Sequence, residues 1–243
     1  MKKTFLLIFA AFSLFSNAQV VVLHPVKVSA DDMENFLEIE TNYSVKIAQD
    51  AVNNGDLIWW GLLRTFNTTA DDYNFLFVNV YKDIETVASD KANWWQNSER
   101  VVGAKPSILF DGWNDDVKFD RRYFYKMQQQ IESNQPGKFV IFNFGTPENV
   151  NRVLESNEKY IIPGFKKNMK KSGMTGWGAA TKITPQGSDY SSFMTFDAFD
   201  TMANLMKHLS GDGAAIKGID FDKIEPIAFD SRYVFEIISA TSN

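Results

Sequence analysis

The chain has 243 residues, a net charge of −5, no cysteine and a hydrophobic content of 44%. Without cysteine it has no disulfide, no thiol nucleophile and no thiolate metal site. An acidic chain without a basic tail argues against a nucleic-acid partner. The hydrophobic content is sufficient for a full core, in one large domain or two small ones.

Residues 1–18 have the layout of a cleavable signal peptide. Lys2 and Lys3 precede an apolar run, and the small residue Ala18 ends the segment. The run is too short to span a bilayer stably. We therefore expect a periplasmic or secreted protein, with no membrane insertion after signal cleavage.

An internal repeat organises the rest of the chain. Residues 36–83 align without a gap with residues 153–200. The identical pairs include Tyr43 and Tyr160, Trp60 and Trp177, and Asp83 and Asp200. The chain is therefore expected to contain two copies of one structural unit.

Apolar periodicity and turn residues predict the same elements in both copies. The first copy is expected to have a strand at 20–27, a helix at 30–54, strands at 57–66 and 73–81, a helix from Asp83 and a strand at 122–130. The corresponding segments of the second copy are 139–144, 147–171, 174–183, 190–199, a helix from Asp200 and 232–239. Pro163 is expected to kink the long helix of the second copy, whereas the first copy has Lys46 at that place.

The predicted order is β-α-β-β-α-β, twice, which is the ferredoxin-like plan. The first unit is assigned to 19–133, a linker to 134–138 and the second unit to 139–243. The first copy also carries an apolar segment between Trp94 and Trp113, which is expected to serve as a lid or as a surface for a protein partner.

Two tandem units, each with a long first helix and a tyrosine-rich hairpin, resemble the dimeric α/β-barrel superfamily. That group includes the NIPSNAP, EthD, antibiotic-monooxygenase and stress-responsive barrel families and the chlorite-dismutase-like haem proteins. The resemblance covers almost the whole chain after residue 18, but it is one of topology, without a diagnostic motif. It implies an α+β fold in which the two ferredoxin-like sheets pack face to face as an α/β barrel within one chain.

Few residues could carry chemistry. The sequence has no phosphate-binding glycine loop, no nucleophile elbow and no His-x-x-x-His spacing, so no metal site is predicted. His24 is a candidate general base. Asp120 and Arg122, two apart on one strand face, could form an acid and an anion clamp, or a structural turn. His208 could bind haem, or could be a histidine favoured by the helix dipole.

The two copies differ in the bulk of their second and third strands. Small residues of the second copy replace large ones of the first, which either reflects interdigitation or leaves a pocket walled by Trp177, Tyr190 and Phe193. The candidate ligand-binding residues are Trp60, Arg64, Trp177, Tyr190, Phe193 and Trp113.

The leading hypothesis is an exported protein that binds a small, mostly apolar or aromatic molecule, without a cofactor. One alternative is an enzyme of the barrel superfamily, either a cofactor-independent oxygenase or isomerase or a haem protein. A second alternative is an interaction module that uses the tryptophan-rich segment. A monomer and a homodimer are both compatible with the sequence.

Overall fold

The computed structural model describes residues 19–111, 117–132 and 135–242. The expected signal peptide and Trp113 lie outside these ranges. The chain divides into two compact units. The first unit contains the described residues up to Phe124 and those from Ile237 onward, and the second unit is Tyr125–Glu236.

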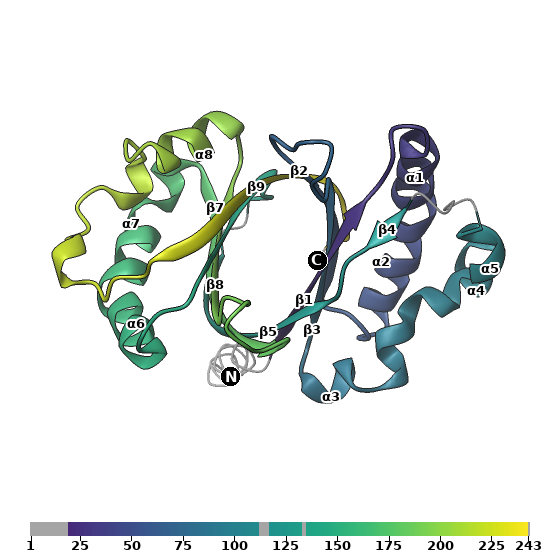
Figure 1. The fold of residues 1–243 in the computed structure, drawn as a ribbon, viewed down its shortest axis with the longest axis horizontal. Coiled ribbons are helices and arrows are strands. Elements are labelled where there is room, and N and C mark those ends of the chain that lie inside the picture. The colour runs from purple at the N-terminus through teal and green to yellow at the C-terminus, as the bar shows by residue number, and fades with distance from the viewer. Residues whose placement is uncertain (1–18, 112–116, 133–134, 243) are drawn as a thin grey trace, which may run out of the picture. The chain divides into compact units, whose positions relative to one another are not determined.

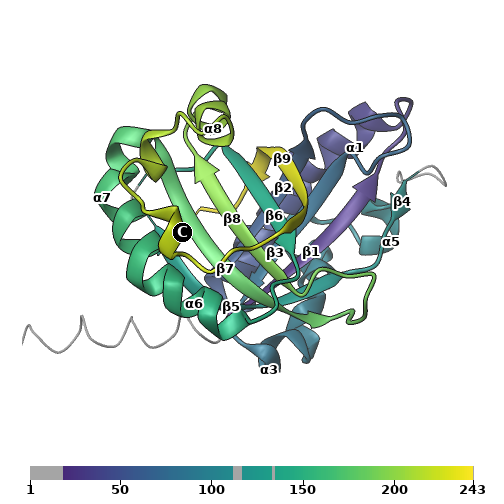
Figure 2. The same ribbon diagram turned by 60° about the vertical axis from the view of Figure 1, so that its left-hand side comes forward.

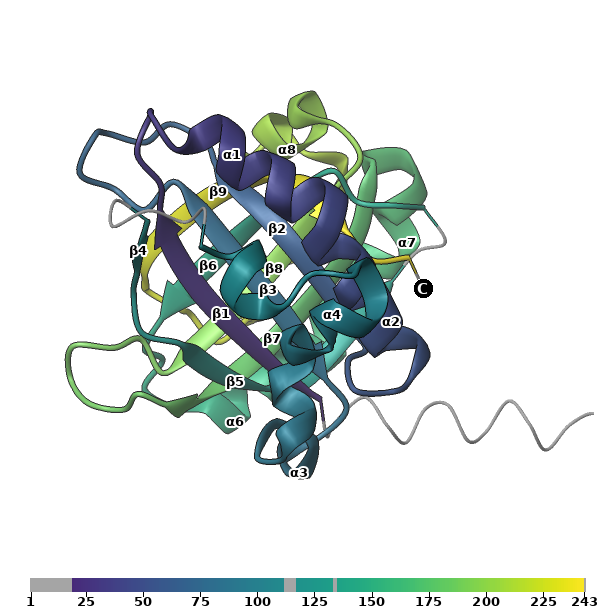
Figure 3. The same ribbon diagram turned by 90° about the vertical axis from the view of Figure 1, so that its right-hand side faces the viewer.

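The first unit has an antiparallel sheet in the order β2-β3-β1-β4. Helices lie on one face of this sheet (Figure 3). The strands are β1 (Val20–Lys27), β2 (Trp59–Thr65), β3 (Phe75–Tyr81) and β4 (Lys118–Phe119), and the helices are α1 (Met33–Ile39), α2 (Val45–Asn53), α3 (Ile84–Val87), α4 (Ser98–Val102) and α5 (Pro106–Leu109). A 3-10 segment, η3 (Asp90–Asn97), precedes α4.

The second unit has the strand order β9-β6-β8-β7-β5, with α6, α7 and α8 on one face of the sheet (Figures 1 and 2). Its strands are β5 (Tyr123–Glu132), β6 (Phe139–Gly145), β7 (Met174–Thr184), β8 (Phe193–Phe199) and β9 (Phe229–Ala240). Its helices are α6 (Val150–Ser156), α7 (Ile162–Ser172) and α8 (Met202–Leu209), followed by the 3-10 turns η5 (Ala214–Ile216) and η6 (Phe221–Lys223). The predicted α+β class and ferredoxin-like order are confirmed.

The compact units do not coincide with the sequence copies. Strand β5 passes from the first unit to the second after Phe124, and β9 returns to the first unit after Glu236. The reason is the length of these strands, because the later part of β5 lies beside β7 and the end of β9 lies beside β2. Thr241 accordingly bonds to the backbone of Trp60.

The long first helix of each copy contains one π turn. In the first copy the turn is η2 (Glu40–Ser44), between α1 and α2, and in the second it is η4 (Asn157–Ile161), between α6 and α7. Pro163 follows the turn of the second copy at the start of α7. We expected the regular α-helix to be interrupted only beside this proline, but a π turn interrupts it in both copies. Proline therefore does not explain the π turn of the first copy.

Strand registers correct the gapless alignment of the copies. Trp60 on β2 lies opposite Asn79 on β3, and Trp177 on β7 lies opposite Asp197 on β8. Asn79 thus corresponds to Asp197 and not to Phe196, with which the gapless alignment pairs it. The hairpin of the second copy is one residue longer, and a shift of one residue moves a side chain to the other face of a strand.

Burial of apolar helix and strand faces stabilises each unit. Phe36 on α1 packs on Phe75 of β3 at a ring-centroid distance of 5.0 Å, and Phe165 on α7 packs on Trp177 of β7 at 5.9 Å. Among the described residues, no helix is long and apolar enough to cross a membrane.

Leu205 tests the core of the second unit. It lies on α8 and is 0% exposed, whereas its neighbour Met206 is 40% exposed. Leu205→Ala is expected to lower the free energy of unfolding by about 2–5 kcal/mol because it leaves a cavity. Met206→Ala is the matched control, with an expected change below about 0.5 kcal/mol. Equal urea midpoints for the two variants would contradict this packing.

Candidate functional site

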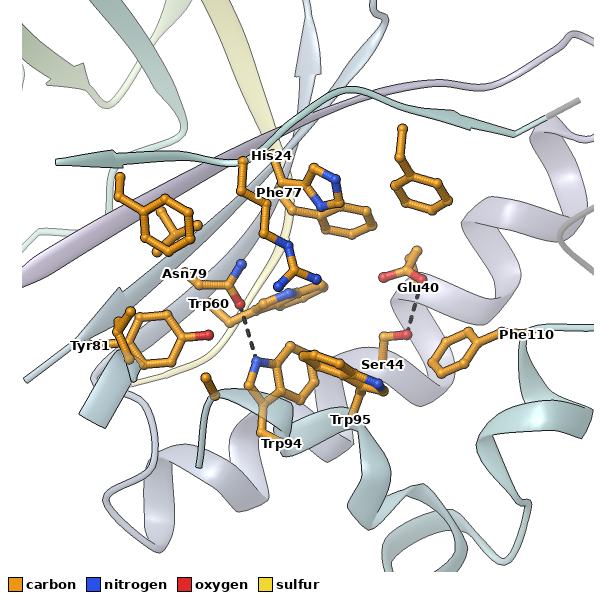
Figure 4. A pocket seen from close by; sticks show the side chains of 16 residues that line it. His24, Glu40, Ser44, Trp60, Phe77, Asn79, Tyr81, Trp94, Trp95 and Phe110 are labelled. Carbon is orange, nitrogen blue, oxygen red and sulfur yellow. Dashed lines mark hydrogen bonds between the residues drawn. The ribbon is translucent and has the colours of Figure 1, made fainter. Parts of the chain in front are cut away.

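A cavity of about 440 Å³ lies in the first unit (Figure 4). Strands β1, β2 and β3 form one wall, and the π turn η2 and the segment 87–110 contribute further walls. The lining residues are Val22, His24, Glu40, Ser44, Trp60, Phe77, Asn79, Tyr81, Val87, Ala92, Trp94, Trp95, Phe110, Phe119, Arg122 and Phe124. The size and the aromatic lining suit a small organic ligand.

Strand alternation explains why these side chains converge. Residues two apart on a strand face the same side, so Val22 and His24 on β1 share a face, as do Phe77, Asn79 and Tyr81 on β3. The register places His24 opposite Phe77 and Val22 opposite Asn79. The sheet therefore presents one continuous row of side chains to the cavity.

Tryptophans from the segment after β3 close on this row. The ring of Trp94 meets that of Trp60 edge-on at 6.4 Å and that of Trp95 edge-on at 6.2 Å. The indole Nε1 of Trp94 donates a hydrogen bond to Asn79 Oδ1 at 3.2 Å. Asn79 thus fixes Trp94 against the sheet, and the segment expected to be a lid or partner surface forms part of the cavity wall.

Glu40 is the buried acid of the cavity. It is 1% exposed and lies in the π turn, and Ser44 donates to its Oε1 at 3.0 Å. Burial raises the pKa of this carboxyl group to about 8, against the smaller lowering effect of the Ser44 bond. Glu40 is consequently a neutral acid at pH 7. Single-turn π insertions are frequent at functional sites.

His24 is the basic group of the cavity. Its Nε2 lies 2.9 Å from the carbonyl oxygen of Asp120, and its ring stacks on Phe119 at 5.2 Å. Because a carbonyl only accepts, Nε2 carries the proton and Nδ1 keeps the lone pair. Burial lowers the pKa of His24, and Arg122 lowers it further. The imidazole is therefore a neutral base.

Asp120 and Arg122 lie between β4 and β5, so the expectation that they share a strand face was wrong, and the two residues have different roles. The Asp120 carboxylate accepts a hydrogen bond from the Tyr123 hydroxyl at 2.8 Å, which is a turn contact. Arg122 reaches the cavity, with its guanidinium 5.5 Å from the ring centroid of Trp95. In the described part of the chain, no carboxylate forms an ion pair with Arg122. Arg122 is thus available to an anionic ligand.

Tyr81 supplies a neutral hydroxyl. Burial raises its pKa to about 12, so the phenol remains protonated throughout the physiological range. Sequence reasoning missed Glu40, Ser44, Asn79 and Tyr81. A usable signal for Glu40 was present, because it lies four residues after the buried Phe36, on the apolar stripe of the helix.

The other proposed ligand-binding residues lie elsewhere. Trp177 and Phe193 are buried in the core of the second unit, and Tyr190 has the Lys182 ammonium 5.3 Å from its ring centroid. Arg64 lines a separate cavity of about 340 Å³ in the first unit. Of that proposed set, the structure places Trp60 on the wall of the larger cavity.

In the second unit, aromatic rings fill the space above the small residues of β7. The Phe196 ring lies 2.3 Å from the position that a Cβ on Gly178 would occupy. Ala179 is fully buried in the same core as Trp177. Phe196 lies opposite Gly178 on the neighbouring strand β8, so the space beside this small residue is filled from within its own sheet.

No protein-family model and no curated protein sequence matches the chain. Solved structures do share its fold. A monooxygenase candidate from Fusobacterium nucleatum subsp. nucleatum is 11% identical, with a TM-score of 0.51 over 93% of this chain and 95% of that chain. A chlorite dismutase candidate is 9% identical, with a TM-score of 0.54 over 91% and 95% of the two chains.

A haem-binding protein from Thermus thermophilus is 7% identical, with a TM-score of 0.52 over 90% of this chain and 91% of that chain. Identities this low show the fold alone. The fold is that of the dimeric α/β-barrel superfamily, and the resemblance inferred from the sequence is confirmed.

The described histidines do not fit haem. His208 Nε2 lies 3.8 Å from Asp197 Oδ1, Phe165 and Phe199 pack on the ring, and Nδ1 is enclosed without a partner. Neither cavity described above reaches this ring. His24 Nε2, the ring nitrogen farther from the backbone, is already bonded to the Asp120 carbonyl oxygen at 2.9 Å.

Glu40 gives a pH-dependent stability that can be measured. The folded protein keeps a proton that the unfolded chain releases above its ordinary pKa of 4.5. The free energy of unfolding should therefore fall with rising pH up to about 8, by about 1.4 kcal/mol per pH unit from this group. Glu40→Gln should gain stability relative to the wild type from pH 5 to pH 8 in urea titrations.

Glu38→Gln is the matched control, because Glu38 is an exposed residue of α1. It should follow the wild type at both pH values. A constant difference between Glu40→Gln and the wild type across this range would show that Glu40 is not a buried neutral acid.

Proposed function

We propose that the first unit binds a small planar aromatic molecule carrying one anionic oxygen. The observation that carries this proposal is the cavity itself, whose lining is rich in aromatic rings and includes Arg122. The Arg122 guanidinium lies 5.5 Å from the Trp95 ring centroid, and no described carboxylate forms an ion pair with it. Trp60, Trp94 and Trp95 offer flat apolar surface, and Arg122 offers donors for a carboxylate or phenolate.

The ligand would enter an apolar space without a cofactor. Glu40 and Tyr81 are neutral there, so they do not repel an anion. The proposed export of the chain, to the periplasm or beyond, would place this cavity where small molecules are captured outside the cytoplasm. The signal-peptide pattern at residues 1–18 supports that location.

Arg122→Gln tests the proposal. With naphthalene-2-carboxylate as the probe, quenching of tryptophan fluorescence is expected in the wild type. The variant should bind about tenfold more weakly, because a charge-assisted hydrogen bond is worth about 1.5–3 kcal/mol. Arg122 is exposed, so the variant should keep its fold.

Arg121→Gln is the matched control, since Arg121 is also exposed but does not line the cavity. It should bind the probe as the wild type does. Equal binding by the two variants, or no binding by any of the proteins, would refute an anion site at Arg122.

A second candidate function is cofactor-independent oxygenation of the bound molecule. The observation in its favour is that His24 and Arg122 line one cavity. Since Nε2 of His24 is bonded to Asp120, the Nδ1 lone pair would accept a phenol proton, and Arg122 would stabilise the resulting anion. The ligand would supply all four electrons that reduce O₂. A phenol O–H and a ring C–H would be lost, one oxygen atom would enter the ring as a quinone carbonyl, and the other would leave as water with the two hydrogens. Solved structures described as monooxygenase candidates share the fold.

Oxygen uptake distinguishes binding from turnover. A panel of naphthalenediols should be oxidised faster with the wild type than with buffer alone. His24→Gln should abolish the enzymatic part while naphthalene-2-carboxylate still binds, because only the base is lost. Equal uptake with and without protein would leave the binding function and eliminate the oxygenase.

A further inference from the structure

Glu40 is a buried hydrogen-bonding group that the proposed aromatic and anion contacts do not use. In the described part of the chain, its one hydrogen-bond partner is Ser44, which donates to Oε1. Figure 4 shows the Glu40 side chain directed from the helix toward the cavity. Its second oxygen therefore remains for whatever occupies the cavity.

Phe36 and Ala48 hold Glu40 in place, because each is fully buried on the same helix stripe. The backbone that carries Glu40 is therefore packed in place on both sides of the π turn, and Glu40 itself is 1% exposed. A polar group in this position costs stability unless it finds a partner.

The charged groups around the cavity leave Glu40 without a counter-ion. His24 on β1 is neutral, and Tyr81 on β3 keeps its proton. Arg122 affects the titration of His24 and Tyr81 but is absent from the causes that act on Glu40. Lys91 in η3 and Arg100 on α4, two elements in contact with α2, pair with Asp56 and Asp50.

A carboxylic acid with one oxygen bonded to a hydroxyl donor has its own O–H to give. The complementary ligand group is an acceptor without a proton, of which a carbonyl oxygen is the simplest. A ligand carbonyl would satisfy this donor without introducing a second charge.

We propose that the Glu40 carboxylic acid donates a hydrogen bond to a ligand carbonyl and thereby selects aromatic anions that carry a ring ketone. This inference rests on the proposed function, since it names the chemistry of the ligand in the same cavity. It makes Glu40 a specificity-determining residue. Ionisation of Glu40 would convert the donor into a repelling acceptor.

A matched pair of probes tests this role. Chromone-2-carboxylate and naphthalene-2-carboxylate are planar two-ring anions of similar size, and the chromone carries a ring ketone. At pH 6 the wild type should bind the chromone about tenfold more tightly, which is the value of one well-formed hydrogen bond. At pH 10 this preference should disappear.

Glu40→Gln should keep the preference at both pH values, because an amide N–H donates at every pH. Glu40→Leu should lose it at both and still bind naphthalene-2-carboxylate. If the variants fail to fold, the pH dependence of the preference in the wild type decides the question alone.

Three results would overturn the inference or its basis. Equal binding of the two anions at pH 6, with both bound, would refute the role of Glu40 and leave the proposed function standing. Tight binding of naphthalen-2-ylmethylammonium, rising with pH and lost in Glu40→Gln, would show that Glu40 is the counter-ion of a cation. Binding of none of the probes would refute the proposed function itself.

Discussion

The packing of α1 and α2 on the first sheet forces one carboxyl group into an apolar interface. Phe36 and Ala48 anchor the helix stripe, and Glu40 lies between them. An isolated buried charge is too costly to persist, so the group either takes up a proton or finds a partner. Glu40 lies in the π turn, accepts a hydrogen bond from Ser44 and lines the cavity.

The two copies share a fold but use the space above the sheet differently. In the second copy, Asn143 donates to the buried Asp197 at 2.7 Å, and Trp177, Phe165 and Phe193 fill the core. Burial raises the pKa of Asp197, and the hydrogen bond from Asn143 opposes this shift. The buried carboxyl group of the second copy therefore has its partner within the core. In the first copy, Asn79 occupies the corresponding place and positions Trp94 at a cavity. Side chains therefore fill the core of the second copy, whereas the first copy contains the candidate site.

Much of the fold could be predicted from the sequence because hydrophobic periodicity and turn residues act locally. The strand at Val20–Lys27 has the expected bounds, and the repeat predicted the second ferredoxin-like unit. The extra residue in the second hairpin could not be seen, because a gapless alignment assumes equal hairpins. Because Pro163 occurs only in the second copy, an irregular helix was expected only there. The first copy has a π turn as well, without a proline.

The candidate site was less predictable, because a cavity depends on contacts between distant segments. His24, Arg122 and Trp60 could be proposed from their residue types, and all three line the cavity. His24 and Trp60 are on strands as expected, whereas Arg122 precedes β5. Glu40 lies on the apolar stripe of the helix, which indicates a buried carboxyl group, but its place at a cavity could not be inferred until the position of the sheet was known. The large side chains on the strands of the first copy suggested a core without a cavity. Side chains from the segment 87–110 instead extend the walls of a cavity beside these strands.

The central claim is that Glu40 is a neutral acid facing a ligand cavity. A ¹³C NMR titration of the glutamate side-chain carboxyl carbons, assigned by comparison with Glu40→Gln, tests it most directly. If Glu40 is a buried neutral acid, its resonance should titrate with a midpoint of about 8, and bound chromone-2-carboxylate should raise this midpoint further. A midpoint near the ordinary value of 4.5, unchanged by the ligand, would contradict it.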